Sequence, residues 1–492
     1  MKKYILIILC CLTSFPLWSY NVNMIVEHYS VDQGLPNNTV NCTLKDRDGF
    51  IWFGTWYGLC CFDGVKFKTF NKQEHDSDVP PRKIQRIVED KNGYIWVKTI
   101  DRKLYVFNKV TECFHAVYDD MKNYSENIQV IKLQNTAEGD VLLLTKDKNL
   151  LLAGVDEKGQ VTIKILFDSR NEINKHDYTL KHHVLCETEE YISWIGTDYK
   201  VAAVHKGSEL ASRPADFITS KINSGDKDSF TSFFEDGRKV WVGDRAGIFY
   251  SIDVRTGLVN RYVLSEIKGA ISNLLVTPAG YVYLSVAGQG TYEYDLAERR
   301  LQKINTEMND AMVTHAFIDQ YDKIWFHENE KALIYYDPLN HTAKRFPFTM
   351  FGKITTLYSE DAGERGLFFL SPAGEAWLFD REHAEMVYIN KLKQLSNDRA
   401  NQQFYHLMLD NDGVLWLSSA DEGVYCMNFP KKQFNLLSLS PQSAGQENYT
   451  IGVRALFQSK SGDIWVGTRW QSVYRMDRNG VTKHVFSTGD EH

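Results

Sequence analysis

The stretch that decides the fold is residues 46–55, Asp-Arg-Asp-Gly-Phe-Ile-Trp-Phe-Gly-Thr, because it recurs along the whole chain. A second clear copy occupies residues 459–468, Ser-Lys-Ser-Gly-Asp-Ile-Trp-Val-Gly-Thr, and further copies surround Trp96, Trp241 and Trp416. Weaker copies centre on Leu143, Trp194, Tyr283, Trp325 and Phe368. Neighbouring copies are about 46 residues apart, a spacing that indicates a repeat architecture.

Each copy predicts a unit of four short strands. In the first copy we expect strands at residues 39–45, 50–55, 59–62 and 65–70. The Asp-x-Asp-Gly sequence before the second strand is a turn signal, and the second strand alternates large and small side chains as a half-buried strand does. A single sheet of this kind cannot bury its two faces. The repeat therefore predicts a β-propeller, in which such sheets pack radially as blades.

The composition agrees with an all-β fold. Aromatic residues make up 13% of the chain and can supply the packing between blades. Helical periodicity is absent from the body of the sequence. Leucine-rich repeats have a shorter period, and the Gly-His and Trp-Asp signature of WD40 blades is missing.

Ten repeats exceed the four to eight blades, roughly, that close a common propeller. We therefore expect a first seven-bladed ring at residues 21–345, anchored from Trp52 to Trp325, and the first blades of a second, incomplete ring at residues 346–492. A polar connection at residues 434–448 marks an alternative boundary near residue 435.

The N-terminus has the pattern of an export signal. Lys2 and Lys3 precede an apolar run at residues 4–12, which is short for a membrane span. We expect residues 1–20 to be a signal peptide and the protein to be periplasmic. An uncleaved anchor is the alternative.

Charge and cysteine spacing exclude several classes of function. The net charge of −7 is mild, and no basic stripe or basic amphipathic helix is present, so we expect neither nucleic acid nor direct membrane binding. The cysteines outside the signal match no metal-site spacing. For Cys42 and Cys60 the alternatives are core packing, which we favour, and a disulfide. We expect no cofactor.

Motifs for catalysis and for metal binding are missing as well. There is no nucleophile elbow, phosphate-binding loop or zinc-protease motif. His182 and His183 would point to opposite faces of a strand. The Asp-x-Asp-Gly segments lack the further ligands of a calcium loop and are read as hairpin turns. We therefore expect no enzyme activity, no catalytic residue and no metal site.

Strand direction predicts where a ligand binds. The turns between second and third strands share one face with the loops that enter the first strands, whereas the Asp-x-Asp-Gly turns lie on the other face. The first face varies between blades, and variable loops on a constant scaffold usually carry recognition. Its aromatic rings beside Arg and Asp suit sugars, although Trp56 and Trp470 are alternatively caps of their own blades. The candidate ligand-binding residues are Trp56, Tyr57, Asp101, Arg102, Asp198, Tyr199, Asp244, Arg245, Gln289, Arg469 and Trp470.

The first repeat also has a family likeness. Residues 29–40, Tyr-Ser-Val-Asp-Gln-Gly-Leu-Pro-Asn-Asn-Thr-Val, followed by Asp-Gly-Phe-Ile-Trp-Phe-Gly-Thr at 48–55, resemble the two-component regulator propeller repeat. The resemblance spans nearly all of residues 24–492. This family typically builds the periplasmic sensor region of hybrid two-component systems in Bacteroidetes-type bacteria.

The resemblance implies a sensor region that binds oligosaccharides from complex glycans and relays the signal to a kinase region. We expect that kinase, and the membrane attachment, to lie beyond this chain. The alternatives are a periplasmic polysaccharide lyase or glycoside hydrolase, and a protein–protein interaction scaffold. The sequence leaves open which glycan is bound, whether the protein is a monomer or a homodimer, and whether the chain is a fragment or a truncated product.

Overall fold

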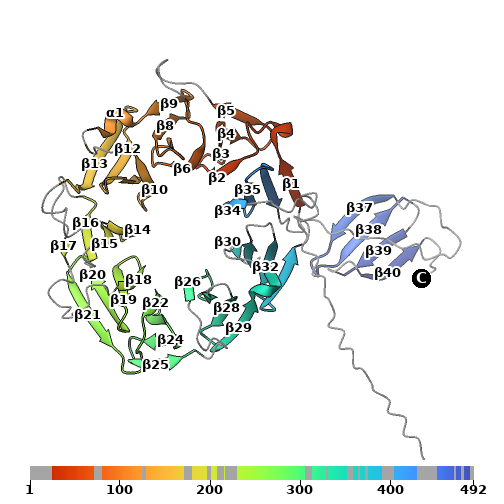
Figure 1. The fold of residues 1–492 in the computed structure, drawn as a ribbon. Coiled ribbons are helices and arrows are strands. Elements are labelled where there is room, and N and C mark those ends of the chain that lie inside the picture. The colour runs from red at the N-terminus through yellow and green to blue at the C-terminus, as the bar shows by residue number, and fades with distance from the viewer. Residues whose placement is uncertain are drawn as a thin grey trace, which may run out of the picture. The chain divides into compact units, whose positions relative to one another are not determined.

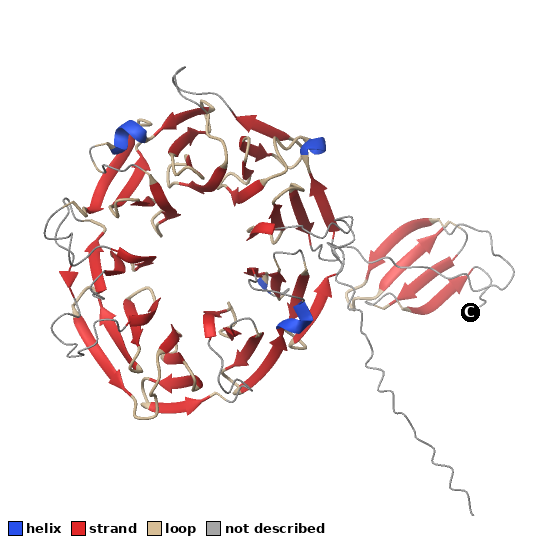
Figure 2. Ribbon diagram, viewed as in Figure 1, coloured by secondary structure: helices blue, strands red, loops and turns tan. Residues whose placement is uncertain are grey.

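The computed structural model describes residues 25–70, 80–122, 124, 129–170, 180–196, 201–207, 215–216, 230–304, 313–328, 331–351, 358–363, 366–371, 375–389, 404–428, 452–469, 472–477 and 481–487. The regular secondary structure of this part is almost entirely strand, with one short α-helix, α1 (Tyr118–Met121), and two 3-10 helices, η1 (Val31–Gln33) and η2 (Phe348–Phe351) (Figure 2). No helix in it is long and apolar enough to cross a membrane. The predicted signal peptide at residues 1–20 lies outside the described residues.

The chain divides into two compact units, Met1–Phe429 and Pro430–His492. In the first unit four-stranded sheets stand around a common axis as the blades of a propeller (Figure 1). The first blade consists of β2 (Val40–Lys45), β3 (Ile51–Thr55), β4 (Gly58–Phe62) and β5 (Phe67–Phe70), paired antiparallel in that order. These bounds confirm the four predicted strands to within two residues.

The same order of strands repeats along the unit. Blades 2 to 8 are formed by β6 (Ile84–Glu89), β7 (Ile95–Thr99), β8 (Leu104–Asn108) and β9 (Cys113–Ala116); β10 (Val130–Asn135), β11 (Val141–Thr145), β12 (Leu150–Val155) and β13 (Val161–Phe167); β14 (Leu180–Glu187), β15 (Tyr191–Gly196), β16 (Val201–His205) and β17 (Ala215–Asp216); β18 (Phe230–Glu235), β19 (Lys239–Asp244), β20 (Ile248–Asp253) and β21 (Leu258–Val263); β22 (Ile271–Val276), β23 (Tyr281–Val286), β24 (Gly290–Asp295) and β25 (Arg300–Lys303); β26 (Val313–Ile318), β27 (Ile324–Glu328), β28 (Ala332–Asp337) and β29 (Thr342–Pro347); and β30 (Tyr358–Asp361), β31 (Leu367–Leu370), β32 (Ala376–Asp380) and β33 (Glu385–Ile389).

Blade 9 is completed by the N-terminal strand. Its own strands are β34 (Phe404–Leu409), β35 (Leu415–Ser419) and β36 (Val424–Asn428), and β1 (Ile25–Tyr29) pairs antiparallel with β36 as the fourth. The first and the last described strands of the first unit therefore share one sheet, which fastens the ring.

Buried apolar side chains fill every junction between neighbouring blades, as a propeller requires. Blade 9 meets blade 1 in the same way, because Phe53 on β3 and Trp416 on β35 lie in one cluster, with ring centroids 5.9 Å apart. All ten predicted anchor residues occupy the second strand of a sheet, including the weak ones, Leu143 on β11 and Phe368 on β31.

The predicted seven-bladed ring ending at residue 345 is wrong. The blades at Phe368 and Trp416 belong to the first unit, because their faces are buried against blade 7 on one side and blade 1 on the other. The described part of this unit contains nine four-stranded sheets. The alternative boundary near residue 435 lies close to the observed division after Phe429.

The second unit is one blade in its described part, formed by β37 (Val453–Gln458), β38 (Ile464–Thr468), β39 (Ser472–Met476) and β40 (Thr482–Ser487). Its buried core consists of Val466, Tyr474 and Met476. On its first strand Leu456 is 69% exposed, whereas Ile87, at the same position of blade 2, is 3% exposed.

The cysteines pack as small apolar side chains. Cys42 lies in the cluster between blades 1 and 2, and Cys60 lies in the cluster between blades 9 and 1. The two free thiols therefore face opposite sides of one sheet, and the alternative of a disulfide between them is wrong. Burial raises the pKa of both thiols to about 12.

Candidate functional site

In several blades the last residue of the second strand shapes the turn on the candidate ligand face, which is here called the loop face. The Thr55 hydroxyl is fully buried, donates to the Gly58 carbonyl at 2.8 Å and accepts from the Tyr57 N–H at 3.1 Å. Similar hydroxyl bonds hold the corresponding turns of blades 2, 3 and 9, through Thr99, Thr145 and Ser419. Because the buried hydroxyl fixes the turn, the residues within the turn are free to vary.

Backbone hydrogen bonds join these turns into a continuous rim across blades 1 and 2. The Trp56 N–H donates to Thr39 O, Lys83 N–H donates to Trp56 O, and Ile100 N–H donates to Lys83 O, at 3.2, 3.0 and 2.9 Å. Lys83 belongs to the loop that enters blade 2, so each entering loop is held against the turns beside it. The rim is a backbone platform rather than a set of independent loops.

Trp56 and Tyr57 project from this platform in blade 1. Their side chains are 43% and 61% exposed, respectively. The Lys83 ammonium lies 5.2 Å from the centre of the Trp56 ring, a cation–π contact. Lys83 was not among the predicted residues. Its position in an entering loop is a sequence signal, but its reach to the ring depends on a left-handed backbone, with φ of 51°.

Asp101 and Arg102 form the corresponding turn of blade 2. The side chain of Asp101 is 60% exposed and pairs with the Lys103 ammonium at 3.3 Å, and it also accepts from the Thr99 hydroxyl. Arg102 is exposed, and its carbonyl accepts from the Val130 N–H of blade 3 at 2.9 Å. The structure thus places an indole, a phenol, an ammonium, a carboxylate and a guanidinium on neighbouring parts of one rim.

Two other candidate ligand-binding residues, Asp244 and Gln289, hold the backbone of turns and loops. Asp244 is 1% exposed and accepts from the N–H groups of Ala246 and Ile248 at 2.9 and 2.8 Å, so it takes the place of the turn-forming hydroxyl in blade 5. Burial raises the pKa of Asp244. The Gln289 amide bonds the backbone of Lys268 and Glu266 in the neighbouring loop.

The remaining candidates are distributed differently. Arg245 is exposed on the turn of blade 5. Arg469 belongs to the second unit, where its N–H donates to Gly452 O at 2.8 Å. Asp198, Tyr199 and Trp470 lie outside the described residues.

The opposite face, here called the turn face, carries the Asp-x-Asp-Gly turns. Asp46 Oδ1 accepts from the N–H groups of Asp48 and Phe50, and its Oδ2 accepts from the Trp52 indole N–H at 2.8 Å. The indole bond recurs in four more blades, between Asp90 and Trp96, Asp236 and Trp241, Asp319 and Trp325, and Asp410 and Trp416. The turn reading is therefore confirmed, and the first acid of the motif also satisfies the buried indole. This acid lies six residues before the tryptophan in four blades and five residues before it in blade 5, a near-constant spacing that could have revealed the bond from the sequence.

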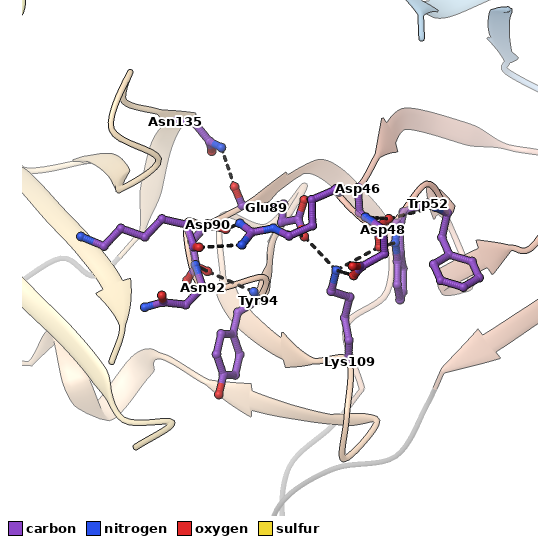
Figure 3. Close-up of polar contacts among 12 residues, drawn as sticks. Asp46, Asp48, Trp52, Glu89, Asp90, Asn92, Tyr94, Lys109 and Asn135 are labelled. Carbon is purple, nitrogen blue, oxygen red and sulfur yellow. Dashed lines mark hydrogen bonds and ion pairs between the residues drawn. The ribbon is translucent and has the colours of Figure 1, made fainter. Parts of the chain in front are cut away.

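Three carboxylates on the turn face, from Asp46, Asp48 and Glu89, lie close enough together to hold a metal ion. The Lys109 ammonium already lies 3.0, 2.8 and 2.8 Å from them, and Figure 3 shows this side chain reaching toward the group. These contacts raise the pKa of Lys109 despite its partial burial. A metal would have to displace this ammonium, so the arrangement is an ion-pair network between blades 1 and 2.

Two cavities in the described part of the chain lie away from the loop-face candidates. One, of about 460 Å³, lies between the outer strands of blades 2 and 3, and its lining includes Tyr94, Cys113 and His115. The Nε2 atom of His115 lies 2.7 Å from Asp120 Oδ2. The other, of about 330 Å³, lies between blades 4 and 5 on the turn face.

Comparisons with known proteins identify the repeat. Residues 34–57 match the family model described as the two component regulator propeller, which confirms the predicted repeat family in the first blade. These residues contain the entering loop of blade 1, β2, β3, Trp56 and Tyr57. No curated protein matches the chain.

Solved structures with a similar fold include extracellular domains of bacterial regulators. The extracellular domain of the hybrid two component system BT3049 from B. thetaiotaomicron is 15% identical, with 94% of this chain and 67% of that chain covered and a TM-score of 0.33. That of BT4673, from the same organism, is 15% identical, with 94% and 66% covered and a TM-score of 0.31. PorZ, a surface component of the type-IX secretion system of Porphyromonas gingivalis, is 13% identical, with 93% and 70% covered and a TM-score of 0.30. The chain spans about two thirds of the length of the two extracellular domains.

Proposed function

We propose that this chain is the ligand-sensing region of a two-component regulatory system and that it binds oligosaccharides through the loop-face rim of blades 1 and 2. One observation carries the proposal. Trp56 and Tyr57 are exposed on a rim held by backbone hydrogen bonds, and both lie within the residues that match the regulator propeller model.

The chemistry of this rim suits a sugar. An exposed ring offers a flat surface for the apolar face of a pyranose. Lys83 and Arg102 can donate to hydroxyl groups or to the carboxylate of an acidic sugar, and Asp101 can accept from hydroxyl groups. Since the platform is held in place before the ligand arrives, little conformational entropy is lost on binding.

A sensing role also needs a change that passes to another part of the system. A ligand shifts a conformational equilibrium only by as much as its affinity differs between the two states. We propose that the kinase region and the membrane attachment belong to a longer protein, and that the chain works in the periplasm after export.

Thermal unfolding of the intact chain with a panel of neutral and acidic oligosaccharides tests the proposal. A ligand that binds the folded state raises the melting temperature by mass action. We expect a rise with at least one oligosaccharide and a loss of that rise in Trp56→Ala. The matched control is Tyr388→Ala, since Tyr388 is 42% exposed and lies on the outer strand β33.

Two results would refute the proposal. One is the absence of any shift at millimolar ligand across the panel. The other is product formation from polysaccharides that is abolished by Asp101→Asn, which would assign the rim to a lyase or hydrolase instead. A protein-binding scaffold would retain its partner after every glycan had been removed.

A further inference from the structure

Four first strands of the ring end in an acidic residue on the turn face. These residues are Glu89 in blade 2, Glu187 in blade 4, Glu235 in blade 5 and Asp361 in blade 8. In each blade the residue that directly follows the third strand belongs to a turn on the same face. The two positions can therefore be compared from blade to blade.

In three of these blades a cation follows the third strand and clamps the acid to the preceding blade. Lys109 lies 2.8 Å from Glu89 and 3.0 Å from Asp46 of blade 1. Lys206 lies 2.5 Å from Glu187 and 2.9 Å from Glu138 of blade 3.

Blade 8 repeats this clamp with an arginine. Arg381 lies 2.7 Å from Asp361 and 2.6 Å from Asp319 of blade 7. A backbone N–H of the preceding blade also donates to the acid at each of the three junctions, from Arg47, Ala137 and Gln320.

Blade 5 has the acid without the cation. The residue that follows β20 is Val254, which is 3% exposed and packs in the apolar cluster between blades 4 and 5. Glu235 Oε2 is buried and has no hydrogen-bond partner among the described residues. A charge on this carboxylate is costly, since the backbone N–H of Glu187 and the charge of Lys206 offset only part of the solvation that is lost.

We propose that the junction between blades 4 and 5 is a pH-sensitive seam of the ring, which is tight when Glu235 is protonated and is weakened when Glu235 carries a charge. This inference does not depend on ligand binding.

The charged groups around Glu235 act in both directions. Burial is the main cause that raises the pKa of Glu235 to about 6, and the carboxylates of Glu187 and Asp236 raise it further, whereas a hydrogen bond from the Glu187 backbone and the charge of Lys206 lower it. Lys206 is already engaged with two other carboxylates. Further charges border the adjoining cavity: Glu189, Glu190, Arg238, Asp253 and Arg255.

The direction of the pH effect follows from the raised pKa. Below the unfolded value of 4.5 both states are protonated, and the stability contribution of the seam is fully present. As the pH rises through about 6 the folded state must lose its proton against an unfavourable environment, so this contribution is lost.

The test is thermal unfolding of the intact chain between pH 4.5 and 8 for the wild type and for Glu235→Gln, which keeps the shape and removes the titration. We expect equal stability at pH 4.5. Above pH 7 the unfolding equilibrium constant of the variant should be lower, by roughly threefold to tenfold, because each pKa unit corresponds to a factor of ten and solvent screens part of the effect at this partly exposed residue. If the stability of the two proteins changed with pH in the same way, the proposal of a pH-sensitive seam would be wrong.

Three further variants separate the seam from general effects. Glu89→Gln at the clamped junction should destabilise the protein at neutral pH, the opposite sign, because it weakens the bond to Lys109. Val254→Lys should supply the missing clamp and raise stability above pH 7, whereas Val254→Met should not. Equal effects of the Lys and Met variants, or stabilisation by Glu89→Gln, would contradict the proposal. If Val254→Lys fails to fold, the comparison of the two Gln variants still decides.

Discussion

The side-chain oxygens of Thr43 and Ser418 lie 2.7 Å apart in a buried hydrogen bond. Thr43 is on the first strand of blade 1 and Ser418 is on the second strand of blade 9, so the bond crosses the junction that closes the ring. The side chains are 6% and 0% exposed. The junction that closes the ring is therefore buried like the rest of the core, and a substitution at this junction should lower the stability of the whole first unit.

Ring closure can be tested at Tyr29 on β1. Its ring lies 5.1 Å from Phe62 and 6.5 Å from Trp416, so it joins the N-terminal strand to blades 1 and 9. Tyr29→Ala should lower the free energy of unfolding by about 2 to 4 kcal/mol, as loss of a packed aromatic side chain does. Urea unfolding followed by tryptophan fluorescence measures this change.

The control for closure is Tyr118→Ala, because Tyr118 is 54% exposed and lies far from the closing junction in sequence. It should leave the free energy of unfolding almost unchanged. Equal stability of the two variants would mean that β1 does not fasten the ring.

The Asp-x-Asp-Gly turn can be tested by comparing its two acids. Asp46 is buried and binds the Trp52 indole, two turn N–H groups and Lys109, whereas the side chain of Asp48 is 57% exposed. Asp46→Ala should cost about 3 kcal/mol, since it leaves the buried Trp52 indole N–H without its acceptor, opens the turn and removes one of the three carboxylates around Lys109. Asp48→Ala should cost less than about 1 kcal/mol. Thermal unfolding measures both, and equal losses would contradict the role assigned to the first acid.

The burial of His406, on β34, leads us to expect that the protein loses stability at acidic pH. Its Nδ1 is buried with no hydrogen-bond partner among the described residues. Burial, with a smaller effect of Arg86, lowers the pKa of His406 to about 4. The unfolded state therefore binds the proton more readily, and the contribution of His406 to stability, present above the unfolded pKa of 6.5, is lost as the pH falls toward 4.

In the His406→Leu variant the free energy of unfolding should therefore fall by about 2 kcal/mol less between pH 7 and pH 4.5 than it does in the wild type. His383 is the control, because its contact with Asp380 raises the pKa of its imidazole. Its contribution to stability is therefore present at acidic pH, and its replacement should make the loss of stability in acid larger rather than smaller. Chemical unfolding at pH 4.5, 5.5 and 7 is the measurement. An unchanged acid slope in His406→Leu would show that the imidazole is not the group responsible.

The blades could be predicted from the sequence because their signals are local. A turn motif and a large apolar residue within ten positions were enough to place the second strand of every sheet, even at Leu143 and Phe368. The number of blades in the ring could not be predicted. It depends on how large side chains pack between blades and on a pairing between Ile25 and Asn428, for which no local pattern exists.

The site was predictable as a set of turns but not as a set of side-chain roles. Trp56 and Tyr57 are exposed as expected, whereas Asp244 folds back to bond its own turn and Gln289 bonds the neighbouring loop. Whether a turn residue points outward depends on the backbone conformation of that turn, which residue type alone does not specify.

The most direct test of the sensing proposal is calorimetric titration of an oligosaccharide that shifts the melting temperature into the intact chain, its Trp56→Ala variant and the Tyr388→Ala control. We predict saturable binding that is weakened roughly 30-fold in Trp56→Ala, the equivalent of about 2 kcal/mol for an aromatic anchor, and unchanged in the control. Equal affinity in all three proteins would contradict the assignment of the ligand site to the rim of blades 1 and 2.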